Sequence, residues 1–112
     1  MESLEDNSMV NFKMEIALDE RRLSDDGYQA SDIYRALEQI FANRNIKKDR
    51  TGLFVGNGTT QDFSNFGGVI IALKRKSWFM PYVSKWIWHT DTGVEDLVAH
   101  YKTTQGLRGT RA

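Results

Sequence analysis

Hydrophobic and polar residues alternate with a period of two near the N-terminus. Over residues 11–18 the hydrophobic positions Phe12, Met14, Ile16 and Leu18 are separated by Lys13, Glu15 and Ala17. Successive side chains of a β-strand point to opposite sides of the sheet, so this pattern is typical of a strand with one buried face. We therefore predict a half-buried strand over residues 11–18.

Two further segments have the character of strands. Residues 51–56 contain a short apolar run bounded by Gly52 and Gly56, which is typical of a buried strand. Residues 83–90 alternate again, but both sides of this strand hold large residues such as Ile87, Trp86 and Trp88. The third strand is therefore expected to be covered on both faces or to offer a tryptophan face to a partner.

Two segments in the first three quarters of the chain have helical periodicity. Residues 30–43 start beside a capping Ser31 and end in asparagines that tolerate the left-handed conformation. Residues 62–75 repeat hydrophobic side chains at helical spacing and end in the cations of residues 74–76. The β-branched run after Gly67 and Gly68 leaves a strand over residues 68–75 as an alternative.

A third helix is predicted over residues 93–103. Thr92 and Glu95 fit a capping box, in which each side chain satisfies a backbone donor at the start of a helix. The charged stretch between the first strand and the first helix, residues 19–27, is predicted to be a turn because it is too polar to pack.

These elements predict an α+β fold in which a small mixed sheet of about three strands is covered by about three helices. The sheet would comprise residues 11–18, 51–56 and 83–90. We expect one domain over residues 10–104, because 112 residues form one core of ordinary size. Residues 1–9 are interpreted as a disordered leader and residues 105–112 as a flexible basic tail.

Composition narrows the class of protein. The chain contains no cysteine, which excludes disulfides and thiolate metal sites, and no apolar run approaches the length of a membrane span. We therefore expect a cytoplasmic protein without a membrane partner. The net charge of zero conceals an asymmetry, because residues 1–42 hold ten acidic and four basic side chains whereas residues 43–112 hold five and eleven. The two halves could attract each other within one molecule or in a head-to-tail contact.

Four residues near the C-terminus are candidates for acid–base chemistry: His89, Asp91, Asp96 and His100. A carboxylate that touches an imidazole fixes its tautomer and raises its basicity, as a general base requires. The same spacing is common in solvated surface pairs and helix caps. No metal site and no cofactor are predicted.

A second candidate is the glycine loop at residues 56–60, which precedes the predicted helix at 62–75. Such loops expose backbone N–H groups that can hold a phosphate. The loop lacks the Lys-Ser/Thr pair of a P-loop and the third glycine of a dinucleotide fingerprint. Turn formation explains it without a ligand.

Aromatic residues are concentrated between positions 63 and 88. We expect most of them in the core and five of them at a partner-binding face: Trp78, Phe79, Tyr82, Trp86 and Trp88. The favoured function is a non-catalytic interaction domain that binds another protein or a second copy of itself, for example as a homodimer. The alternatives are a small acid–base or metal-dependent enzyme and, third, single-stranded nucleic-acid binding, for which cations interleave with the aromatics.

Overall fold

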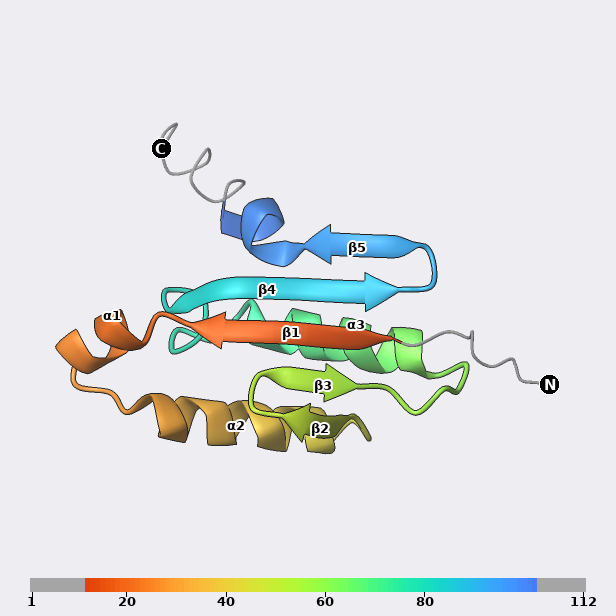
Figure 1. The fold of residues 1–112 in the computed structure, drawn as a ribbon, viewed down its shortest axis with the longest axis horizontal. Helices are drawn as coiled ribbons and strands as arrows, with labels where there is room; N and C mark the ends of the chain where they lie inside the picture. The colour runs from red at the N-terminus through yellow and green to blue at the C-terminus, as the bar shows by residue number, and fades with distance from the viewer. Residues whose placement is uncertain (1–11, 103–112) are drawn as a thin grey trace.

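A five-stranded antiparallel sheet organises the chain (Figure 1). The computed structural model describes residues 12–102. The strands are β1 (Lys13–Leu18), β2 (Lys47–Arg50), β3 (Leu53–Val55), β4 (Val83–Thr90) and β5 (Gly93–Asp96), and they lie in the order β2-β3-β1-β4-β5. The helices are α1 (Glu20–Asp25), α2 (Ala30–Ala42) and α3 (Asp62–Leu73). A fourth helical segment runs from Leu97 to Lys102, the last described residue.

The connectivity follows a known arrangement of helices and strands. When α1 and β5 are set aside, the order is β1-α2-β2-β3-α3-β4, with β1 between β3 and β4. This is the split β-α-β arrangement of ferredoxin-like folds. The arrangement hosts many functions, so it identifies the architecture and not the activity.

The strand β1 is central and buried on one side only. Met14, Ile16 and Leu18 are buried, whereas Lys13 is exposed and Glu15 is partly exposed. The prediction of a half-buried strand is therefore confirmed. We call the side of the sheet that carries Lys13 and Glu15 the open face, and the opposite side the helix face.

The hydrophobic core lies on the helix face, where α3 passes behind β1 and β4 in Figure 1. The rings of Phe41 in α2 and Phe54 in β3 stack with their centroids 3.8 Å apart and an interplanar angle of 3°. Trp86 in β4 is fully buried, and its Nε1 donates to the sulfur of Met14 at 3.1 Å. The first contact joins α2 to β3, and the second joins β4 to β1 within the core.

The end of α2 follows the sequence prediction closely. Asn45 adopts the left-handed conformation with a φ of 61°. Ile46 N donates to Phe41 O at 3.0 Å, and Asn45 N donates to Ala42 O at 3.0 Å. This pair of bonds is the Schellman motif, in which the residue after the left-handed position also packs against the last turn. Ile46 is accordingly buried.

The sheet differs from the prediction in its number of strands and in their relative directions. It is antiparallel throughout rather than mixed, and the described residues contribute five strands rather than about three. The additional strands β2 and β5 lie at the two edges, and all eight of their residues are exposed. Edge strands need no hydrophobic alternation, which explains why the periodicity of the sequence did not indicate them.

The predicted helix over residues 93–103 is wrong in its first turn. Gly93–Asp96 form β5, which pairs with β4 through a hairpin, and the helix begins only at Leu97. Its cap is therefore not the Thr92–Glu95 box: Ala99 N donates to Asp96 Oδ1 at 3.1 Å. An aspartate that accepts from the third residue of a helix is the usual N-cap geometry.

The remaining predictions have mixed outcomes. Helices α2 and α3 confirm the segments 30–43 and 62–75, so the strand alternative over 68–75 is wrong. The charged turn over 19–27 instead contains α1, whose Leu23 is fully buried. The leader at 1–9 and the tail at 105–112 lie outside the described residues. None of the helices within residues 12–102 combines the length and hydrophobicity that crossing a lipid bilayer requires.

β1 approaches the turn between β2 and β3 closely, and substitutions at two glycines with similar backbone conformations test whether the fold depends on this contact. Gly52 and Gly58 have φ values of 81° and 79°, but a Cβ at Gly52 would collide with Ile16 O, whereas a Cβ at Gly58 meets no atom within 4 Å. Gly58→Ala should cost about 1 kcal/mol through backbone strain alone. Gly52→Ala should cost about 2–5 kcal/mol because the clash adds to that strain. Urea denaturation measures both, and equal losses would contradict the role given to the approach.

Candidate binding surfaces

The five aromatic residues predicted to bind a partner lie mainly in the core. Phe79 and Trp86 have no exposed surface, and Tyr82 and Trp88 are each 8% exposed. Trp78 alone is partly exposed and packs against the edge of the core. Their role in partner binding stays a prediction, and the surface available for it on the described residues is that of Trp78.

The four residues predicted for acid–base chemistry have different surroundings. His89 Nε2 lies 2.5 Å from Glu15 Oε2, across the β1–β4 pair on the open face. Asp96 caps the last helical segment, and the His100 ring lies edge-on to Tyr101 with a centroid distance of 4.7 Å. Asp91 is exposed in the turn between β4 and β5. Among residues 12–102 no group of three or more His, Cys, Asp or Glu side chains is placed to hold a metal ion.

Glu15 is the side chain that contacts His89, and sequence reasoning missed this contact. Its second oxygen, Oε1, lies 3.0 Å from Lys85 Nζ, so the carboxylate is held between a cation and an imidazole. The hydrogen bond from Lys85, and next that from His89, lower the pKa of Glu15 below its ordinary value of 4.5, while burial acts in the opposite direction. The arrangement joins β1 to β4 and fixes the orientation of the His89 ring.

The glycine loop holds an anion that belongs to the chain itself. Asn57 N donates to Asp62 Oδ1 at 3.0 Å, and Gly58 N donates to Asp62 Oδ2 at 2.8 Å. Asp62, in the first turn of α3, is 1% exposed. A Cβ at Gly56 would lie 2.5 Å from this carboxylate, so the glycine makes room for it. These two backbone donors are therefore occupied by Asp62 rather than available to a phosphate.

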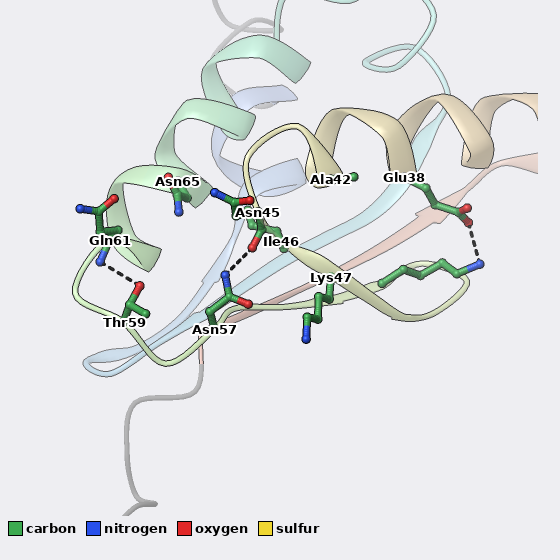
Figure 2. A pocket seen from close by; sticks show the side chains of 10 residues that line it. Glu38, Ala42, Asn45, Ile46, Lys47, Asn57, Thr59, Gln61 and Asn65 are labelled. Atoms are coloured by element: carbon green, nitrogen blue, oxygen red, sulfur yellow. Dashed lines mark hydrogen bonds and ion pairs between the residues drawn. The ribbon is translucent and has the colours of Figure 1, made fainter.

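A groove opens where the end of α2, the start of β2 and the loop before α3 meet (Figure 2). It has a volume of about 810 Å³, and we call it the amide groove because carboxamide side chains dominate its wall. Ala42 and Ile46 contribute apolar surface. The other lining residues are Glu38, Asn45, Lys47, Lys48, Asn57, Thr59, Gln61 and Asn65.

The carboxamides of the amide groove retain most of their hydrogen-bonding capacity. Within residues 12–102, the side chains of Asn45, Gln61 and Asn65 form no hydrogen bond with protein atoms. Asn57 is the exception, since its Nδ2 donates to Asn45 O at 2.5 Å and joins the two loops that form the groove. A free carboxamide offers donors and an acceptor together, so the wall can satisfy both groups of a ligand.

No protein-family model matches the chain, and no curated protein is similar to it at a significant level. A function for this chain is therefore inferred from the geometry of residues 12–102.

The internal role of Asp62 predicts a large effect on stability. Asp62→Asn replaces one acceptor oxygen with an NH₂ group that faces a backbone donor, which should lower the free energy of unfolding by about 1–3 kcal/mol. Asp32 is a matched control because it also lies in the first turn of a helix but is exposed. Asp32→Asn should cost less than about 0.5 kcal/mol. Equal effects in thermal or urea denaturation would show that the loop does not depend on this carboxylate.

The contacts of Glu15 with Lys85 and His89 predict how the contribution of Glu15 to stability depends on pH. Because its folded-state pKa is lowered, the ionised side chain stabilises the fold above pH 4.5, and this contribution is lost as the pH falls through the lowered pKa. A carboxyl NMR titration should place its midpoint below 4.5. Lys85→Met should raise that midpoint more than His89→Phe, since Lys85 is the larger cause. The opposite ranking would assign the shift to the histidine.

Proposed function

We propose that this chain is a non-catalytic interaction domain whose amide groove binds an extended segment of a partner polypeptide. The observation that supports this proposal is the set of unpaired carboxamides, those of Asn45, Gln61 and Asn65, around one groove. The partner class agrees with the expectation from the sequence that the domain binds protein. The surface is different, because the aromatic residues named there are largely buried.

The chemistry of a polypeptide backbone matches that of the groove wall. Each peptide unit of an extended segment presents one N–H donor and one C=O acceptor, and a carboxamide side chain can pair with both. Such contacts do not depend on the partner's side chains, so they supply affinity without fixing a sequence. The exposed side chain of Ala42 in the groove favours a small hydrophobic side chain at one position of the segment.

The charged groups at the rim of the groove differ in whether they already have an ion-pair partner within the chain. Glu38 Oε2 lies 3.3 Å from Lys48 Nζ at one end, whereas Lys47 has no ion-pair partner among the described residues. A carboxylate on the partner can therefore pair with Lys47 without displacing an internal partner. This charge favours peptides with an acidic residue beside the segment that enters the groove.

Neither alternative function is supported by the groove. Its lining includes no histidine and no aromatic ring, so it offers no general base of that type and no surface on which bases stack. The acid–base hypothesis for His89 and the nucleic-acid hypothesis stay predictions from the sequence.

A random dodecapeptide library displayed on phage and selected against the full chain tests the proposal. The enriched peptides, synthesised and measured by calorimetry, should bind the unmodified protein and lose about 5- to 150-fold in affinity on the Gln61→Ala/Asn65→Ala variant, because each lost hydrogen bond contributes about 0.5–1.5 kcal/mol. The matched control is Gln39→Ala/Asn43→Ala. Gln39 lies on α2 and Asn43 is the residue that follows it; both are exposed. They form a side-chain hydrogen bond of 3.2 Å and do not line the groove.

Two results would contradict the proposal. One is a selection that enriches no binding peptide. The other is a set of peptides whose affinity falls as much on the control variant as on the groove variant, which would place the binding site elsewhere. Circular dichroism of both variants verifies that loss of binding is not loss of folding.

A further inference from the structure

The two edges of the sheet carry opposite charge. The β2 edge has the sequence Lys-Lys-Asp-Arg and the β5 edge has the sequence Gly-Val-Glu-Asp. Every residue of both strands is exposed, and Figure 1 shows β2 and β5 on opposite sides of the sheet. An edge strand has unpaired N–H and C=O groups on its outer side, which can accept a further strand.

We propose that copies of this chain associate head to tail, with β5 of one copy pairing with β2 of the next to form a continuous sheet. The occupant of each edge is thus a second copy of the chain. Lys47 and Lys48 also line the amide groove, but this inference does not require peptide binding there, because it concerns the outer edges of the strands and their charges. The proposal assigns two particular strands to the head-to-tail contact that we inferred from the acidic and basic halves of the sequence.

The charges are complementary on each face of the sheet. Lys47 is opposite Val55, which is itself opposite Lys13, so Lys47 lies on the open face. Asp96 lies on the same face, because it is opposite Ile87 and Ile87 is opposite Glu15. Each strand is antiparallel to its neighbour, so β2 and β5 run in the same direction and pair in parallel when the open faces of both copies lie on one side. On this face Lys47 can then be placed beside Asp96.

The helix face repeats the arrangement. Lys48 is opposite Phe54, and Glu95 is opposite Trp88, and both aromatic residues are buried on the helix face. On this face β5 thus brings Glu95 to a lysine that already forms an ion pair with Glu38 of α2, with Lys48 Nζ 3.3 Å from Glu38 Oε2. Cross-strand pairs of opposite charge stabilise a sheet by about 0.2–1 kcal/mol each.

The same charges act against symmetric pairing. Two β2 edges would bring together two strands with net positive charge, although each also contains Asp49, and two β5 edges would bring together two strands with net negative charge. Like charges on neighbouring strands are destabilising. A two-fold dimer through either edge is therefore disfavoured. Pairing of unlike edges leaves one free edge at each end, so association continues into a chain of copies or closes into a ring.

Exposed Val94 adds an apolar contact to the β5 edge. Its side chain is 65% exposed and lies on the open face, opposite His89. A neighbouring strand would cover it. Because β2 and β5 each contain four residues, the paired segment is short, and we expect association to be reversible and weakened by salt.

Charge reversal at one edge at a time tests the proposal with the full chain. Lys47→Glu/Lys48→Glu makes both edges acidic, and Val94→Lys/Glu95→Lys makes both edges basic, while Asp96 keeps its capping role. In sedimentation experiments at low salt, the unmodified protein should show an average mass that rises with concentration. Each variant alone should associate at least about tenfold more weakly.

Mixing the two variants is the decisive measurement. An equimolar mixture should recover the association of the unmodified protein, because each acidic edge then meets a basic edge, and recovery also shows that both variants are folded. Hydrogen exchange should become slower at the amides of β2 and β5 in the mixture.

Three results would overturn the proposal: an unmodified protein that stays monomeric at millimolar concentration, variants that associate as strongly as the unmodified protein, or two variants that are folded by circular dichroism and do not associate when mixed. The amide-groove test changes Gln61 and Asn65, which lie outside β2 and β5, so its outcome is separate from this one.

Discussion

Burial of one side of β1 is the constraint on which the rest of the structure depends. Met14, Ile16 and Leu18 lie at the centre of the sheet and are removed from water, at a gain of about 1.5–3 kcal/mol for each side chain. This gain is obtained only if α2 and α3 cover the same face, because the intervening residues are Lys13, Glu15 and Ala17. The open face, the edges and the loops at the ends of the helices are left to solvent as a consequence.

The elements that are buried were the ones that the sequence could predict. The alternation in residues 11–18 and 83–90 records one-sided burial, and the periodicity of 30–43 and 62–75 records a helix that packs on one face. The strand β2 has no apolar residue, so no hydrophobic pattern could indicate it. The strand β5 was mistaken for a helix because Thr92 and Glu95 have the spacing of a capping box, whereas hairpin pairing with β4 decides the conformation.

The candidate sites were less predictable because they depend on register and on contacts between distant segments. His89 was identified, but its partner Glu15 is separated from it by 74 positions and meets it only through the pairing of β1 with β4. For the glycine loop the sequence favoured turn formation over phosphate binding, and it did not indicate that two backbone N–H groups of the loop bind the carboxylate of Asp62. The dense aromatic segment was correctly expected to contribute to the core, and burial of Phe79 and Trp86 follows from that role.

The two proposed binding surfaces follow from the same one-sided architecture. A sheet with helices on one face only must end in two unpaired edges, and charged side chains keep those edges soluble by disfavouring contact between like edges. In this chain the two edges have opposite charge, so the same side chains that prevent symmetric pairing favour pairing of unlike edges. The amide groove arises where α2 ends in its left-handed Asn45 and the chain turns to enter the sheet, because the Schellman turn leaves the loop residues Asn45 and Asn57 facing solvent beside the start of α3. Both proposed binding surfaces are therefore built from exposed edge strands and loops, and the buried core serves only to position them.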